Sequence, residues 1–90
     1  MKKAVVTVVG KDAVGIIAAI CNYLAKNSIN ILDISQTIVD GYFNMMMIVD
    51  FSQCEKQLSF ISDELRDVGE TRGVIVHCQS EEIFEMMHRI

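Results

Sequence analysis

A polar turn bounded by two glycines, Gly10 to Gly15, is the part of the chain whose residue types could bind a small ligand. It follows an apolar segment, Ala4 to Val9, and precedes a helical pattern that opens near Val14. Such a turn points backbone N–H groups outward at the start of a helix, where the peptide dipoles favour a carboxylate or another anion. We therefore predict a site for a small anionic ligand here.

Each polar group of the turn has an expected role. The N–H groups of Ala13, Val14 and Gly15 are predicted to hold a ligand carboxylate, and Asp12 or the Asn30 amide to receive the ligand ammonium. Gly15 would be glycine because a Cβ would crowd the ligand or a helix–strand contact. The alternative is that Asp12 only caps the helix and Gly15 only meets a packing need.

Other chemistries fit the residue spacing poorly. The turn also matches the start of a phosphate-binding loop, but Ile16 and Ile17 stand where Lys and Ser or Thr must reach phosphate and Mg²⁺. His77 and Cys78 are neighbours on a predicted strand, so they point to opposite faces and cannot chelate one metal together. With no nucleophile–base pair evident either, we predict no catalytic residues, no metal and no cofactor.

The composition predicts one small globular domain over residues 1–90, with a modest core of its own. The net charge of −4 and the scattered basic residues argue against nucleic acid as a partner. No apolar stretch approaches the roughly 20 residues of a membrane span. The cysteines, Cys21, Cys54 and Cys78, are odd in number and widely separated, which suits a reducing compartment. We expect a cytoplasmic protein that does not bind membranes.

The residue pattern around the turn predicts a strand and then a helix. Ala4 to Val9 is β-branched on both faces, as in a central strand, and Gly10 ends it. Apolar residues at helical spacing follow from Val14, with Asp12 placed to cap the start and Asn27 to stop the end.

A β-hairpin is predicted next. Ile31 to Val39 alternates in polarity, and Tyr42 to Phe51 forms the partner strand. Asp40 and Gly41 between them suit a type I′ turn, in which both central residues need positive φ. The apolar residues expected to share one face of the first strand are Leu32, Ile34 and Ile38.

Three consecutive methionines occupy the second strand of this hairpin. We assign Met45 and Met47 to the core because alternate residues of a strand share a face. Met46 falls on the opposite face with Ile48 and Ile75, away from the helices. A bare apolar patch usually marks association, so these three residues are predicted to form an oligomer interface.

The second helix is predicted to open with a capping box, Ser52 and Glu55. Apolar residues at spacings of three and four then continue from Cys54 to Val68, and Gly69 closes the helix. This stripe predicts a helix with one face against the sheet.

The last elements are a strand over Arg72 to Gln79 and a short helix, Glu81 to Ile90, capped by Ser80. The order βαββαβ plus a C-terminal helix is typical of an α+β, ferredoxin-like sandwich. It has a four-stranded antiparallel sheet with two helices on one face. Right-handed crossovers lead us to expect the first and third strands parallel at the centre.

Several patches of the sequence resemble the ACT domain, the small regulatory module of amino-acid metabolism. The chain is most similar to the stand-alone ACT proteins, whose function is mostly unassigned, and more distantly to the glycine-cleavage repressor family. The patches that carry the resemblance are Val8 to Asp12, Gly15-Ile16, Asn30-Ile31, Asp33 to Thr37 and Met45 to Met47.

The resemblance implies a dimeric module that binds an amino acid or a similar metabolite at the turn, near a subunit interface. Asp12 and Gly15 match the Asp-x-x-Gly turn of the family, and Asn30 with Ile31 matches the start of the second strand facing it. Many ACT turns carry proline where this chain has Val14, so this turn is less preorganised. The predicted ligand-binding residues are Lys11, Asp12, Ala13, Val14, Gly15, Asn30 and Ile31.

Together these features predict a regulatory module that is not an enzyme and that senses an amino acid or a related small carboxylate. It would act in trans, through oligomerisation or through a partner such as a regulated enzyme. The alternative left open is an interaction or scaffolding module whose pocket is empty.

Overall fold

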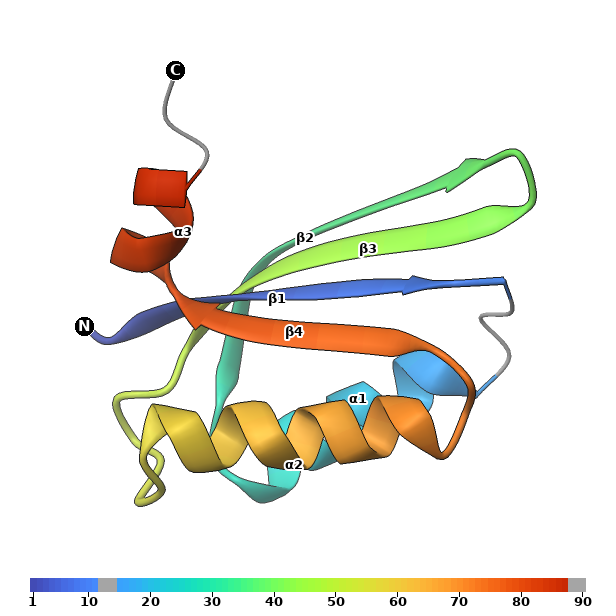
Figure 1. Cartoon of the computed structure of the whole chain (residues 1–90). Helices are drawn as coiled ribbons and strands as arrows, with labels where there is room; N and C mark the ends of the chain where they lie inside the picture. Colours follow the sequence, from blue (N-terminus) through green and yellow to red (C-terminus); the bar gives the residue numbers. More distant parts are fainter. Residues whose placement is uncertain (12–14, 88–90) are drawn as a thin grey trace.

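The structure is a computed structural model that describes residues 1–11 and 15–87. It confirms the ferredoxin-like βαββαβ order with a further short helix, and Figure 1 shows the elements along the chain. The elements are β1 (Lys3–Gly10), α1 (Ile16–Lys26), β2 (Asn30–Val39), β3 (Tyr42–Asp50), α2 (Leu58–Glu70), β4 (Ile75–Ser80) and α3 (Glu81–Met87).

The four strands form one sheet in the order β2-β3-β1-β4. The expected parallel pairing of the first and third strands is wrong, because β1 and β3 pair antiparallel, with Val6 opposite Met47. The crossover through α1 makes β2 run in the direction of β1, and the tight turn at Asp40 and Gly41 then reverses β3. Both turn residues have positive φ, 52° and 79°, as predicted.

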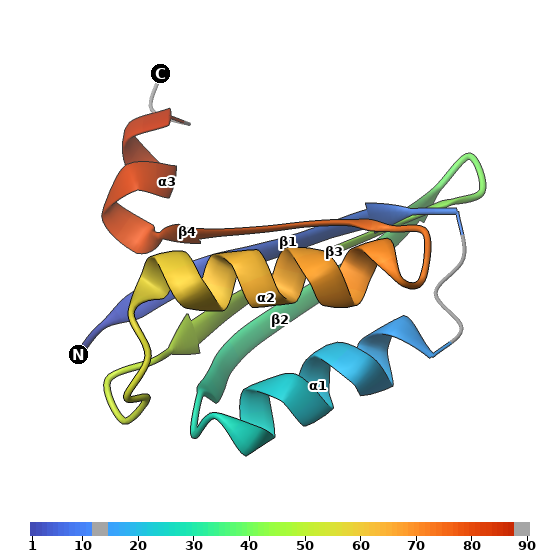
Figure 2. The same cartoon turned by 60° about the horizontal axis from the view of Figure 1, so that its bottom comes forward.

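Helices α1 and α2 cover one face of the sheet, and α3 rises from the opposite face (Figure 2). The core lies between the sheet and the two longer helices. Met45 and Met47 belong to it, with 2% and 0% of their surface exposed, so their assignment to the core is confirmed. Other fully enclosed members are Val6, Val8, Ile16, Ile20, Leu24, Ile61 and Leu65.

The predicted start of α2 is wrong. The N–H and the hydroxyl of Ser52 both donate to the Asp50 carboxylate, which holds Ser52 in a turn after β3. The helix begins only at Leu58, with Gln57 at its N-cap. The carboxylate that ends β3 therefore competes with the capping box for the same serine.

The second strand is more exposed than its alternation predicts. A β-bulge between Ile31 and Asp33 displaces Leu32 from the ladder. Ile34 and Ile38 pair opposite core residues of β3, yet 41% and 76% of their surfaces are exposed. The hairpin rises away from the helices toward its tip, in keeping with this exposure (Figure 1).

Candidate functional site

Among the described residues, from Gly15 onward, the start of α1 carries no acidic residue and no side-chain cap. Gly15 is the N-cap residue, in the left-handed conformation at φ 78°, and it has no side chain to accept from the first N–H groups. The first turn of α1 carries no acidic residue. The N-cap position therefore belongs to Gly15; Asp12, Ala13 and Val14, three of the predicted ligand residues, lie outside the described residues.

An arginine lies against this helix start. A Cβ built on Gly15 would be 3.0 Å from Nη1 of Arg72. The positive φ favours glycine at this position, whereas the guanidinium is the end of a flexible side chain that a small movement would take clear of a Cβ. Sequence reasoning missed Arg72 because no motif connects it with a turn nearly sixty residues earlier.

The connection between α2 and β4 places Arg72. Its N–H donates to the Gly69 carbonyl at 2.9 Å, and the Val74 N–H donates to the same oxygen at 3.0 Å. Gly73 between them adopts φ 71°, which only glycine takes readily. Because of this tight turn, β4 begins at Ile75. The sequence pattern instead predicts a strand that begins at Arg72.

In the part of the site that the structure describes, the helix start and Arg72 both contribute positive charge. Among residues 1–11 and 15–87, the ion pairs join Lys56 to Glu64 and Arg66 to Asp63, and neither involves Arg72. The positive end of a helix dipole and a guanidinium beside it both favour an anion. A carboxylate is the ligand group that this arrangement suits.

The other predicted ligand residues divide between two places. Lys11 follows β1, and its ammonium lies 5.7 Å from the ring centre of Tyr42 on the hairpin, a cation–π contact. Asn30 and Ile31 lie at the other end of the sheet, because Asn30 is level with Asp50 while Gly10 is level with Phe43. Within one chain, Asn30 therefore does not face the turn, contrary to the prediction.

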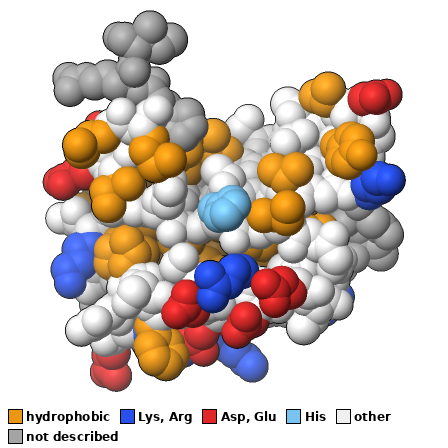
Figure 3. All heavy atoms as spheres, viewed as in Figure 1, with side chains coloured by type: hydrophobic (Ala, Val, Ile, Leu, Met, Phe, Trp, Pro, Cys, Tyr) orange, Lys and Arg blue, Asp and Glu red, His pale blue; other side chains and the backbone are white. Residues whose placement is uncertain are grey.

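The sheet face without α1 and α2, called here the open face, carries the predicted oligomer residues. Met46 and Ile75 are 41% and 59% exposed, and Ile48 is half-buried. In Figure 3, hydrophobic side chains gather on α3 and on the sheet and hairpin opposite it, whereas charged side chains cluster along α2. The face thus has the apolar character that was predicted for it.

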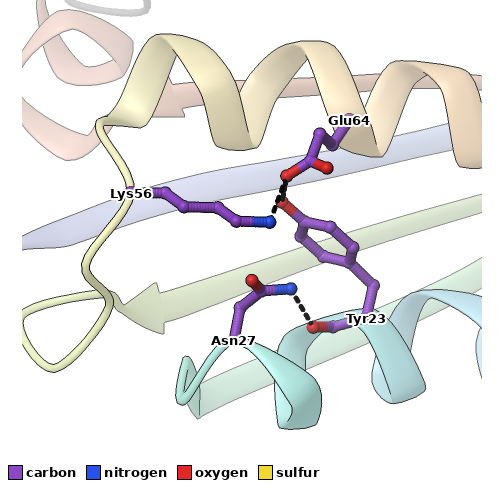
Figure 4. A network of polar contacts seen from close by, with 4 residues as sticks. All are labelled: Tyr23, Asn27, Lys56 and Glu64. Atoms are coloured by element: carbon purple, nitrogen blue, oxygen red, sulfur yellow. Dashed lines mark hydrogen bonds and ion pairs between the residues drawn. The ribbon is translucent and has the colours of Figure 1, made fainter.

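A polar network joins α1 to α2 on the covered side (Figure 4). The Tyr23 hydroxyl donates to Glu64 at 2.9 Å, and the Lys56 ammonium donates to the same oxygen at 2.6 Å. Lys56, followed by Tyr23, lowers the pKa of Glu64, while burial and the bond to Glu64 raise the pKa of Tyr23. These groups satisfy one another, so the network holds the two helices together.

The cysteines lie in or near the core, as small apolar residues do. Cys78 lies in the core, where burial raises the pKa of its thiol to about 11. Cys54 packs against the core, and Cys21 is half-buried. In the described part of the chain, no three acidic, histidine or cysteine side chains are grouped to hold a metal ion, and no helix is suited to crossing a bilayer.

Comparison with known proteins gives consistent matches. A family model described as ACT domain matches residues 2–79. A UPF0237 protein of Bifidobacterium longum is 57% identical over the full length of both chains. The structure of an ACT domain protein from Streptococcus pneumoniae superposes with a TM-score of 0.82 at 42% identity, covering 93% of this chain and 94% of that one.

A more distant match shares the fold alone. The crystal structure of a putative glycine cleavage system transcriptional repressor has a TM-score of 0.72 at 20% identity. It aligns with 88% of this chain, which spans only 45% of that protein.

Proposed function

Because the chain belongs to the ACT-domain family, whose members are small-molecule-binding regulatory modules, we propose that it senses an amino acid or a related small carboxylate. The ligand would bind at the turn between β1 and α1. Its carboxylate would lie at the start of α1, against Gly15 and the Arg72 guanidinium.

The contact between Gly15 and Arg72 carries this proposal. A guanidinium beside the positive end of a helix is unfavourable unless an anion neutralises both. Binding a carboxylate there converts that repulsion into two attractions, one to the helix N–H groups and one to Arg72. Gly15, the N-cap residue, has no side chain that could compete with a ligand for those N–H groups.

The proposed site of one chain comprises Lys11 to Gly15 together with Arg72. Asn30 and Ile31 can take part only from a second copy, because the register of the sheet separates them from the turn. The ligand ammonium would then be received by Asp12 or by an amide of that second copy.

The output would be transmitted in trans, in the cytoplasm, through a homodimer or a partner protein. The open face, with Met46, Ile48 and Ile75, is the surface we propose for oligomerisation. A scaffolding module with an empty turn is the competing function, and it would share this surface.

A thermal-shift screen against the standard amino acids and common keto acids separates the two functions. A ligand at about 100 times its Kd adds about 2.7 kcal/mol to the free energy of unfolding. For a domain of this size that corresponds to roughly 10–20 °C in Tm. A clear shift with at least one compound supports the sensor, whereas no shift at millimolar concentration favours the scaffold.

A further inference from the structure

Helix α3 carries apolar side chains that the rest of its own chain does not bury. Phe84 and Met87 line a hollow of about 330 Å³ against the open face, and the Gln79 amide donates to the Met87 sulfur at 3.4 Å. Ile83 and Met86 lie farther round the helix and are 52% and 73% exposed. At helical spacing these four apolar side chains form one continuous arc. Much of that arc therefore faces solvent in a single chain.

The opposite side of α3 is acidic, with Glu81, Glu82 and Glu85. An amphipathic helix of this kind is stable when its apolar arc is covered and its charged arc meets water. One copy of the domain covers only the edge of the arc that carries Phe84.

A second hollow occupies the half of the open face that α3 leaves bare. It measures about 290 Å³ and adjoins the first one, since Thr7 and Met46 line both. The exposed Ile75 lies on the neighbouring strand, where it pairs with Val9. Side chains that face this hollow, all without charge, are Thr7, Val9, Ser35, Thr37, Asn44 and Met46.

The chain exposes more surface than a compact monomer of its mass. Its accessible surface is 5956 Å², whereas a compact monomer of 10.1 kDa is expected to expose about 5,300 Å². Much of the apolar part of this surface lies on the open face and on α3, where a partner can cover it.

We propose that two copies pack with their open faces together and that α3 of each copy fills the second hollow of the other. Ile83 and Met86 of one copy would contact Met46 and Ile75 of the other. Figure 1 shows α3 at one end of the open face and the hairpin at the other, so a half-turn brings each helix over the bare half of the facing sheet. Such a contact is the same in both directions and closes as a dimer.

This inference rests on the proposed oligomerisation through the open face, and it adds the segment that occupies that face. The uncharged lining of the second hollow accepts an apolar arc without burying an unpaired charge. The glutamates of α3 remain on the outer side of the assembly, in water.

Light scattering of Met86→Lys tests the exchange of α3. Met86 is 73% exposed in one copy, so the substitution leaves the monomer fold intact, as circular dichroism would verify. The wild type is expected at twice 10.1 kDa. Met86→Lys should weaken the dimer roughly 10- to 100-fold, because a charge replaces an interfacial apolar group. The matched control is Phe60→Lys, which alters a similarly exposed apolar residue on α2, 61% exposed, and should remain dimeric.

The outcomes separate this inference from the proposal on which it rests. A dimer that is lost with Met46→Lys but kept with Met86→Lys overturns the α3 exchange and leaves the open-face interface standing. A dimer that survives both substitutions overturns both statements. A wild type that stays monomeric at every concentration also overturns both and assigns the face to another protein.

A cross-link tests the geometry directly. Chains with Ile75→Cys are mixed with chains carrying Met86→Cys, oxidised, and mapped by mass spectrometry to distinguish the native cysteines. A disulfide requires Cα atoms within about 7 Å, so the mixed linkage forms only if α3 lies over β4 of the other copy. Linkage between residues 75 and 86 of different chains supports the exchange, and its absence in a confirmed dimer overturns it.

Discussion

Gly15 at the start of α1 and the open face are both exposed, but the two regions differ in chemistry and in scale. At the turn, a left-handed glycine stands at the N-cap of α1 and the Arg72 guanidinium lies beside it. The open face carries two adjoining, largely apolar hollows and several uncovered apolar side chains. The first suits a single small anion, and the second suits a folded surface.

The comparison shows two regions of different chemistry on one small domain. If the turn binds a ligand and the open face associates, as proposed, ligand binding can shift the equilibrium between monomer and dimer. Strand β1 connects them, since Gly10 ends it at the turn while Thr7 and Val9 face the open side. The predictions below ask whether the two regions can be altered separately.

The largest effect is expected for the stability of the fold, at two neighbouring methionines of β3 that point to opposite faces of the sheet. Met47 is fully buried, so Met47→Ala should lower the free energy of unfolding by about 2–5 kcal/mol. Its neighbour Met46 points to the open face. Met46→Ala should therefore change the free energy of unfolding of the monomer by less than about 0.5 kcal/mol. Urea denaturation of dilute samples measures both; equal losses would contradict the assignment of the two faces.

The next effect concerns association. Met46→Lys should weaken the dimer about 100-fold, because an ammonium would be buried without a partner at the interface. Analytical ultracentrifugation gives the dissociation constant. The thermal shift caused by a ligand should persist in this variant, and its disappearance would show that the two regions cannot be separated.

The converse substitution tests the turn. Arg72→Gln should weaken ligand binding roughly 10-fold or more, the loss expected when a charge-assisted hydrogen bond to a carboxylate is removed. Arg66→Gln is the matched control, since Arg66 pairs with Asp63 on the surface of α2. The dimer should be unaffected by either change. Equal affinity in the two variants would remove Arg72 from the site.

The smallest effect is expected in the network between α1 and α2, which serves as a reference outside both regions. Tyr23→Phe removes one hydrogen bond to Glu64 and should cost about 1 kcal/mol of stability. Ligand binding and dimer formation should not change. A loss of ligand binding or of dimer formation would show that contacts between α1 and α2 contribute to that function.

The same network predicts a pH dependence. Lys56 and then Tyr23 lower the pKa of Glu64, so its stabilising contribution is complete above the usual pKa of glutamate. It is lost as the pH falls through the lowered value. Acid titration of Glu64→Gln should therefore show a flatter decline in stability than the wild type, and parallel curves would contradict this assignment.

Local patterns predict much of this fold because they depend on neighbours in the chain. Alternation along β3 and the turn at Asp40 and Gly41 place Met45 and Met47 in the core. The start of α2 escapes prediction because Asp50 holds the serine that was expected to cap it. The exposure of β2 escapes too, since it depends on how the hairpin rises from the helices.

The candidate site is predicted only in part for the same reason. The glycine-bounded turn in the sequence is enough to identify Gly15 as a site residue. Arg72 does not, because its place beside Gly15 arises from tertiary packing of the α2–β4 connection. Asn30 matches the family pattern, but the sheet register carries it to the far end of the same chain.

Calorimetric titration of the wild type and of Gly15→Asp, with the compound that gives the largest thermal shift, tests the central claim most directly. The added carboxylate would neutralise Arg72 and the helix start, so it occupies the place of the ligand anion. We predict saturable heat with the wild type and none with the variant, while the variant stays folded by circular dichroism. Unchanged affinity in a folded Gly15→Asp protein would contradict a ligand site at this turn.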